Sequence, residues 1–263
     1  MGVDRRPGDL TLGVPRSAFR PSAVFLGLVT VWITGGVMAW QEYGNLNFDI
    51  FLFVVAGWLV SLSLHEYAHA LLAYRAGDVG VAARGYLTLN PLKYTHPVLS
   101  IVLPVIILLL GGIGLPGGAV WVDRHAVRGR FADSVISAAG PGVNVLFTIL
   151  LTLPFVFGAD TSEHRAFWAG LAFLAFLQLT ASMLNLLPIP GVDGGNLLRP
   201  WLSDTWGRRF DVIAPFGMLV LFALLFEPTV GRIFFDVVFW LADLIGLPES
   251  LYFEGRSLLQ FWR

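Results

Sequence analysis

The sequence predicts an all-α polytopic membrane protein with about six transmembrane helices plus a re-entrant hairpin. Of its 263 residues, 56% are hydrophobic and only 13% are charged, whereas an ordinary soluble domain has about 25% charged residues. Several apolar stretches reach the roughly 20 residues that a helix needs to cross the hydrocarbon layer. Basic residues gather at the ends of these stretches, where the positive-inside rule can be used to orient them.

The apolar stretches define the expected spans in order. The first follows an Arg-rich arm and is too long for the core of a signal peptide, so we expect a retained helix. The last is the least regular, because two aspartates seven residues apart lie within it. The six predicted spans cover residues 21–40, 49–76, 134–158, 166–187, 212–226 and 230–247.

A further apolar stretch, residues 97–120, is predicted to enter and leave the membrane on one side. Basic residues flank both of its ends, and the positive-inside rule places both flanks in the cytoplasm. Prolines and a run of glycines also interrupt it, and irregular backbone at membrane depth is tolerated against protein or a water-filled cavity. A full span whose following basic cluster breaks the rule is the alternative.

The hairpin leads to six crossings with both termini in the cytoplasm. Residues 1–20 would form a cytoplasmic arm, 21–248 a single transmembrane domain, and 249–263 an interfacial tail that mixes aromatic residues with arginine. A net charge of −1 gives no indication of a nucleic-acid partner. The absence of cysteine excludes disulfides and thiolate ligands, so any metal must be held by histidine and carboxylate.

The second span carries an HExxH motif, His65-Glu66-Tyr67-Ala68-His69. Residues four apart share one face of a helix, so His65 and His69 can hold one metal ion while Glu66 lies beside it. The alternative is a set of polar side chains that only pair between helices. Ionisable groups inside a membrane span are costly and usually functional, which favours the metal site.

A catalytic zinc site needs a third protein ligand and an open position for water. The candidate is Asp193, in the segment Asn185-Leu-Leu-Pro-Ile-Pro-Gly-Val-Asp193-Gly-Gly that follows the fourth span. Pro188 and Pro190 end the helix, and the paired glycines allow a tight turn toward the HExxH helix. The alternative is that Asp193 caps the short helix expected over residues 196–202.

Polar residues on two other spans are candidates for the same site. Asn144, in Ala139-Gly-Pro-Gly-Val-Asn144, could donate to a developing oxyanion or orient substrate, or could be one hydrogen bond in a small-residue packing seam. Gln178, Ser182 and Asn185 share a helical face that could line the site or serve packing. His96 stands near the predicted cytoplasmic mouth, whereas His125 and His164 are expected only in polar loops.

The HEYAH, AGPGVN and NLLPIPGVDGG motifs together resemble those of the site-2 protease family of intramembrane zinc metalloproteases. The resemblance covers residues 49–202, and the segment Gly85-Tyr-Leu-Thr-Leu-Asn-Pro-Leu-Lys-Tyr-Thr-His-Pro97 also resembles compact bacterial and archaeal members. It implies one zinc ion per chain, bound by His65, His69 and Asp193, with Glu66 as catalytic base. The implied reaction is hydrolysis of a peptide bond in or near the transmembrane helix of a single-span substrate.

The resemblance also implies a bacterial or archaeal cell membrane, and the topology predicted from the basic residues places the active-site mouth on the cytoplasmic side. No PDZ or CBS domain of the kind found in many members is recognised in the chain, so substrate selection is unexplained. We expect the hairpin or an adjacent loop to hold the substrate as an extended strand. A metal-binding scaffold or a transporter without proteolytic activity is the alternative function. The substrate and the oligomeric state are not indicated.

Overall fold

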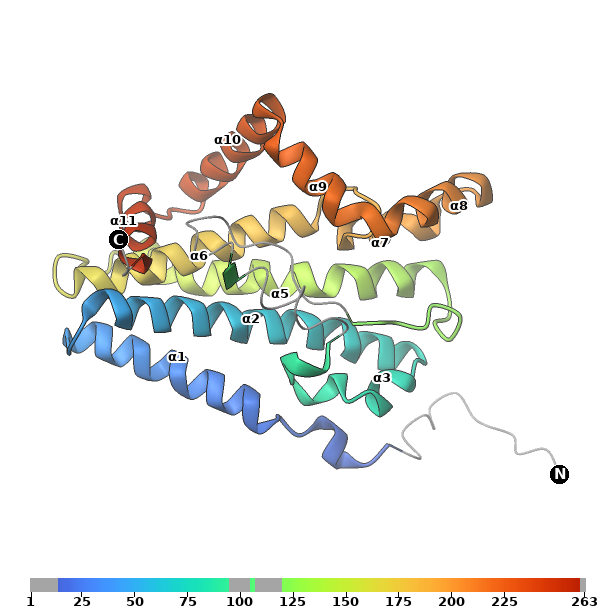
Figure 1. The fold of residues 1–263 in the computed structure, drawn as a ribbon, viewed down its shortest axis with the longest axis horizontal. Helices are drawn as coiled ribbons and strands as arrows, with labels where there is room; N and C mark the ends of the chain where they lie inside the picture. The colour runs from blue at the N-terminus through green and yellow to red at the C-terminus, as the bar shows by residue number, and fades with distance from the viewer. Residues whose placement is uncertain (1–13, 95–104, 107–119, 261–263) are drawn as a thin grey trace.

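The computed structural model describes residues 14–94, 105–106 and 120–260, and these residues form helices and connecting loops with no strand. Four long helices make up a bundle: α1 (Ala23–Gln41), α2 (Leu46–Ala76), α5 (Arg130–Val156) and α6 (Arg165–Asn185). They lie side by side with α2 and α6 in the interior (Figure 1). The predicted all-α architecture is therefore confirmed.

Shorter helices complete the fold around this bundle. The 3-10 turns η1 (Arg16–Phe19), η2 (Tyr86–Thr88), η3 (Pro91–Lys93), η5 (Arg199–Trp201) and η6 (Ala214–Phe216) link the longer elements. The remaining helices are α3 (Gly80–Ala83), α7 (Asp193–Leu198), α8 (Asp204–Ile213), α9 (Gly217–Phe226), α10 (Pro228–Leu244) and α11 (Glu249–Leu259).

Helix α2, which carries the HExxH motif, begins and ends at defined local signals. The Asn45 side chain accepts a hydrogen bond from the Phe48 backbone N–H, which satisfies one free donor of the first turn. At the other end Gly77 adopts a positive φ of 120°, and the Asp78 N–H returns to the Ala73 carbonyl at 3.0 Å. This reversal requires glycine, and it places Asp78 beside the end of the helix.

Five helical segments are long and apolar enough to cross a membrane among the described residues. Four of them, Arg16–Gln41, Leu46–Ala76, Arg130–Val156 and Arg165–Asn185, agree with the first four predicted spans. The fifth, Asp204–Phe226, begins earlier than the predicted span 212–226 because α8, η6 and α9 follow one another closely. The predicted total of six is not reproduced.

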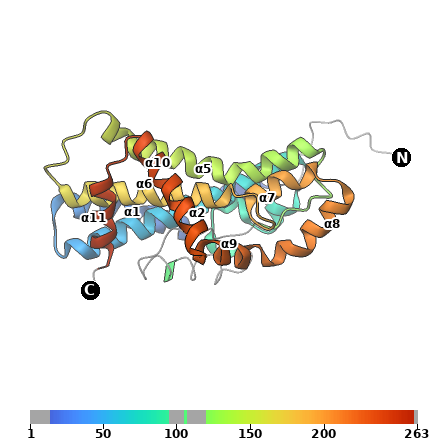
Figure 2. The same ribbon diagram turned by 90° about the horizontal axis from the view of Figure 1, so that it is seen from above.

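Of the last two predicted spans, 212–226 lies within the candidate segment Asp204–Phe226, whereas 230–247 corresponds to α10, which is not among the candidate spans of the described residues. Gly217 lies against the Pro190 carbonyl at the end of the bundle where α6 finishes, which we call the site end. Gly246 lies against Val156 at the opposite end, the far end. Helices α9 and α10 therefore run from one end to the other once, with α10 passing obliquely over α6 (Figure 2).

The lengths of α9 and α10 explain why apolar composition alone does not define a membrane span in this part of the chain. With 10 residues in α9 and 17 in α10, the two helices are about 15 and 26 Å long at roughly 1.5 Å per residue. Each is shorter than a hydrocarbon core of about 30 Å. The break falls at Glu227-Pro228, where the Glu227 carboxylate accepts from the Val230 N–H.

The two ends of the described chain consequently lie at opposite ends of the bundle (Figure 1). Residues of η1 contact η2 at the site end, whereas α11 packs across α6 and α2 at the far end. Gly255 of α11 lies directly on the Ala169 carbonyl, and Leu251, Tyr252 and Leu259 are buried. Residues 249–259 of the predicted interfacial tail form α11, and the placement of both termini in the cytoplasm stays a prediction.

Two predictions fall on residues that the structure does not describe. His96 lies outside the described residues. The predicted hairpin, residues 97–120, also lies outside them except for residues 105–106 and Val120.

The arrangement predicts which loops share a side of the membrane. Because the chain has no cysteine, single substitutions can be labelled with a membrane-impermeant maleimide on intact cells. Ser162→Cys and Ser250→Cys, both exposed at the far end, should react from one side, and Ser203→Cys, exposed at the site end, from the other. Labelling of Ser250→Cys from the same side as Ser203→Cys would restore the six-span topology.

Candidate metal centre

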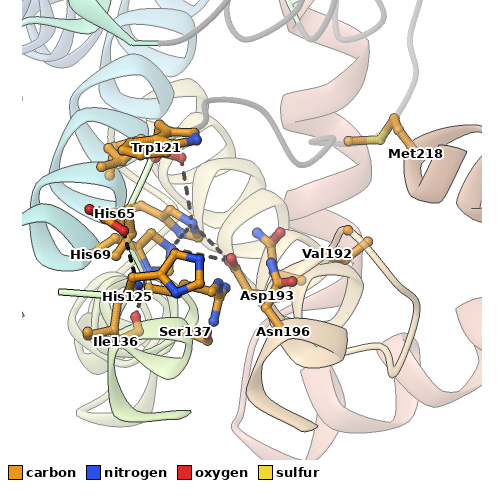
Figure 3. Close-up of a pocket in the computed structure, with 17 residues that line it drawn as sticks. His65, His69, Trp121, His125, Ile136, Ser137, Val192, Asp193, Asn196 and Met218 are labelled. Carbon is orange, nitrogen blue, oxygen red and sulfur yellow. Dashed lines mark hydrogen bonds and ion pairs between the residues drawn. The ribbon is translucent and has the colours of Figure 1, made fainter. Parts of the chain in front are cut away.

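Three side chains from two distant segments converge at the site end of the bundle (Figure 3). His65 and His69 stand one turn apart on α2, and their Nε2 atoms are 3.1 Å from each other. The Oδ2 atom of Asp193, at the start of α7, lies 3.2 Å from the first nitrogen and 3.3 Å from the second. The structure thus brings together the three residues that the sequence suggested as ligands.

The spacing of these atoms fits a single metal ion. Four ligands arranged as a tetrahedron around zinc, with bonds of about 2.0–2.1 Å, are roughly 3.3–3.4 Å apart. The three ligand atoms form a triangle with sides of 3.1, 3.2 and 3.3 Å. Two imidazole nitrogens and one carboxylate oxygen are also a ligand set that zinc accepts at catalytic sites.

Hydrogen bonds on the far side of each ring fix the orientation of the two histidines. The Nδ1 of His65 lies 2.8 Å from Asn144 Oδ1, and the Nδ1 of His69 lies 2.7 Å from the Ile136 carbonyl. Because both partners accept, each ring donates from Nδ1 and keeps the Nε2 lone pair for a metal. Both acceptors belong to α5, so this helix sets the tautomer of both ligands.

Gly140 allows α5 to approach the ligands closely. A Cβ atom at this position would collide with the Nε2 atoms of both His65 and His69. Gly142, two residues later in the same motif, faces open space. The glycine pair in AGPGVN therefore has unequal roles, and only the first glycine is required by the metal centre.

The segment that carries Asp193 is anchored on both sides. Backbone carbonyls of the α6–α7 turn lie where Cβ atoms of Gly194 and Gly195 would be, so the chain can close tightly here. Ser134 of α5 donates to the Leu197 carbonyl at 2.7 Å and accepts from Trp201 Nε1 at 2.8 Å. These bonds tie α7 to α5, the helix that also orients the histidines.

Electrostatics keep the Asp193 carboxyl in its anionic form. Burial alone would raise the pKa of Asp193, but His65 and His69, when their rings are protonated, outweigh burial through charge and hydrogen bonds and hold that pKa well below its usual range. A carboxylate that is ionised at neutral pH is the form that binds a cation.

Glu66 lies next to this group. Its two carboxylate oxygens face different ways, and only one of them is on the side of the ligand triangle. Its Oε1 is 3.9 Å from His65 Nε2, while its Oε2 accepts a hydrogen bond of 3.0 Å from the Val120 N–H. The side chain is only 3% exposed. One oxygen is thus held by backbone, and the other faces the metal side.

A cavity of about 500 Å³ opens beside the ligands. His65, Glu66, His69 and Asp193 form one wall, and residues 120–125 form another. Asn185 and Asn196 also contribute. The cavity is large enough to receive a segment of polypeptide, and it reaches the metal ligands directly.

The three polar residues predicted to share one helical face, Gln178, Ser182 and Asn185, have different roles in the structure. Asn185 lines the cavity, as the functional interpretation suggested. Gln178 instead accepts from the Ser61 hydroxyl at 2.6 Å, and Ser182 donates to the Gln178 carbonyl. Packing is therefore the role of the first two residues.

Trp121 and His125 are among the cavity-lining residues that sequence reasoning missed. The ring of His125 has no hydrogen-bond partner within the described part of the chain, and it lies outside the three-residue metal group. His125 sits in a short polar loop with no neighbouring motif, so the sequence offered no signal for it. His164, by contrast, stacks on Trp40, with ring centroids 4.0 Å apart.

Comparison with known proteins places the chain among named bacterial relatives. It is 45% identical over 251 residues, 94% of this chain and 96% of the relative, to "Putative zinc metalloprotease Rip2" of Mycolicibacterium smegmatis. The identity and coverage are the same for the protein of that name from Mycobacterium tuberculosis. "Putative zinc metalloprotease YwhC" of Bacillus subtilis is 29% identical over 67% of this chain and 81% of its own length. The chain matches no family model and no solved structure.

The two glycines of AGPGVN provide a direct test of the centre. Gly140→Ala should abolish zinc binding, because its methyl group would occupy the space of the ligand nitrogens. Gly142→Ala, which meets no neighbour, should retain one zinc per chain. Zinc would be measured by mass spectrometry of metal in the purified proteins. Equal zinc content in the two variants would contradict the site as described.

Proposed function

The chain belongs to the site-2 protease family of zinc metalloproteases, and we propose that it is a zinc-dependent intramembrane endopeptidase. It would hydrolyse a peptide bond in or near the transmembrane helix of a membrane-bound substrate, as in regulated intramembrane proteolysis. The observation that carries the proposal is the triangle of His65, His69 and Asp193 with Glu66 beside it. The names of the relatives support the same chemistry.

The position of the site supports cleavage at membrane depth. His65 stands ten residues before Arg75 near the end of α2, which is about 15 Å at roughly 1.5 Å per residue. Helix α2 is apolar and long enough to cross the membrane. A substrate bond that reaches this site must therefore enter the membrane region or lie at its edge.

The proposed ligands would hold one zinc ion, with Glu66 as the base. When bound, zinc lowers the pKa of a water molecule to about 7 and polarises a carbonyl group. The Glu66 Oε1 atom faces that position, and it would take the water proton and pass it to the leaving amine. The Val120 N–H holds the other oxygen, so the carboxylate does not rotate freely.

The contacts of Asn144 indicate a role different from the oxyanion donor or substrate-orienting residue that its motif suggested. Its Oδ1 accepts from His65, and it is not among the residues that line the cavity. We infer that Asn144 is a positioning residue for the ligand His65. The oxyanion role stays a prediction for Asn144, and Asn185, which reaches the cavity, is a second candidate donor.

Substrate binding must expose a peptide carbonyl, since an intact helix keeps its carbonyls in hydrogen bonds. The segment from Val120 to Asp123 has no helical structure and lies along the cavity. Its position supports the proposal that substrate is held as an extended strand beside it. We further propose a single-span substrate in a bacterial cell membrane, with the active-site mouth on the cytoplasmic side.

A metal-binding scaffold or transporter is the competing proposal. Such a protein would need the ligands but not a carboxylate placed for proton transfer. Glu66 is present and buried beside the ligands. The part of the chain that the structure describes contains a single three-residue metal group, whereas a transport path usually has several.

Glu66→Gln separates the two proposals. The variant should keep its zinc, because the ligands are unchanged, and its cleavage rate should fall by about 10²–10⁴-fold, the usual contribution of a general base. Tagged single-span proteins would be co-expressed with each form, and fragments compared by immunoblot. Equal cleavage by wild type and a zinc-loaded Glu66→Gln protein would exclude the protease mechanism.

Asn144→Ala in the same assay distinguishes its two roles. Loss of the bond to His65 should weaken zinc binding by about 10–100-fold, the usual effect of removing a partner of a metal ligand. Added zinc should then restore most of the cleavage. Unchanged zinc affinity together with a large fall in kcat would instead identify Asn144 as the oxyanion donor.

A further inference from the structure

We propose that Trp121 is a specificity-determining residue. Its indole ring would form the wall of the subsite that receives a substrate side chain next to the cleaved bond, and it would favour large apolar side chains over small or cationic ones. This inference rests on the proposed protease function.

Trp121 is next in the chain to a residue that touches the proposed base. The Val120 N–H donates to Glu66 Oε2 at 3.0 Å, and adjacent Cα atoms are about 3.8 Å apart. Trp121 lines the same cavity as His65, Glu66 and Asp193 (Figure 3). A side chain that flanks a bond held at the metal would therefore lie within reach of the indole.

The local chain direction turns Trp121 toward the cavity. Side chains alternate along an extended segment. Val120 and Val122 pack against the buried cluster that contains Tyr74 and Ile136. Trp121, between them, is 51% exposed. A large apolar ring left exposed beside a proposed active site is available to a ligand.

Two charged residues hold this segment in place. Asp78, only 3% exposed, accepts from the Asp123 N–H with Oδ2 at 2.8 Å and from the Gly80 N–H with Oδ1 at 2.9 Å. The Arg84 guanidinium lies 4.3 Å from the centre of the Trp121 ring. Asp78 stands just after α2 and Arg84 just after α3, so the chain that leaves the helix with the metal ligands also fixes the wall. Because this wall is already held in place, it loses little conformational entropy when a ligand binds.

The Arg84 contact also indicates which side chains the wall accepts. The guanidinium lies over one face of the indole, and Trp121 is still 51% exposed, so part of its apolar surface is available to a ligand. A phenylalanine, leucine or methionine side chain would gain contact with that surface. A lysine or arginine would meet the positive charge of Arg84, which disfavours it.

A second tryptophan provides a matched control. Trp206 is 61% exposed and lies under a guanidinium, with Arg209 Cζ 5.1 Å from its ring centre. It belongs to α8 and does not line the cavity. Replacing Trp206 removes a similarly exposed indole from beside an arginine and leaves the proposed subsite unchanged.

The test uses purified full-length protein and single-span peptides that differ only beside the cleaved bond, which carries Phe, Leu, Ala or Lys. Trp121→Ala should lower kcat/KM for the Phe and Leu peptides by about 10–100-fold, in the range of one pocket contact, and change the Ala peptide less than about threefold. Trp121→Phe should restore most of the preference. Trp206→Ala should match wild type, and zinc content should be equal in all forms.

Three outcomes would overturn the inference. An equal loss for every peptide would mean that Trp121 only supports the structure, and an unchanged preference in Trp121→Ala would mean that the wall lies elsewhere. The same change in Trp206→Ala would show a general effect of losing a surface indole. If wild type cleaves none of the peptides, or cleaves them no faster than Glu66→Gln, the proposed function itself fails and the inference with it.

Discussion

Ionisable groups inside an apolar helix are the constraint on which the rest of the structure depends. A charged residue at the centre of a membrane helix costs about 2.5–3.5 kcal/mol. Two histidines and a glutamate lie within five consecutive residues of α2. The fold offsets that cost by partnering each of them: Asn144 and Ile136 bind the outer ring nitrogens, and Val120 binds Glu66. Asp193 completes a group whose geometry suits one cation.

Helix α5 is the element that makes these partners possible. It contributes the acceptors for both rings, the glycine that allows close approach, and Ser134, which fixes the segment carrying Asp193. The AGPGVN motif is thus a supporting surface for the metal centre rather than a separate site. Helix α2 in turn is followed by Gly77 and Asp78, and Asp78 positions the opposite wall of the cavity.

Much of this could be predicted because each prediction rested on a local physical signal. Apolar length identified the four bundle helices, and the i, i+4 spacing of His65 and His69 defined a metal face. Pro188, Pro190 and the paired glycines indicated the turn that presents Asp193. Local signals did not predict the features that are determined by packing between residues far apart in the sequence. The path of α9 and α10 depends on contacts with α5 and α6, and Trp121 and His125 become part of the cavity only through Asp78 and Glu66.

X-ray absorption at the zinc edge of the purified protein tests the central claim most directly. The wild-type spectrum should require two imidazole ligands and a carboxylate oxygen. Asp193→Ala should retain the two imidazoles where zinc remains bound and should lower zinc occupancy. A wild-type spectrum with fewer than two imidazoles, or identical spectra and occupancy for wild type and Asp193→Ala, would contradict the site described here.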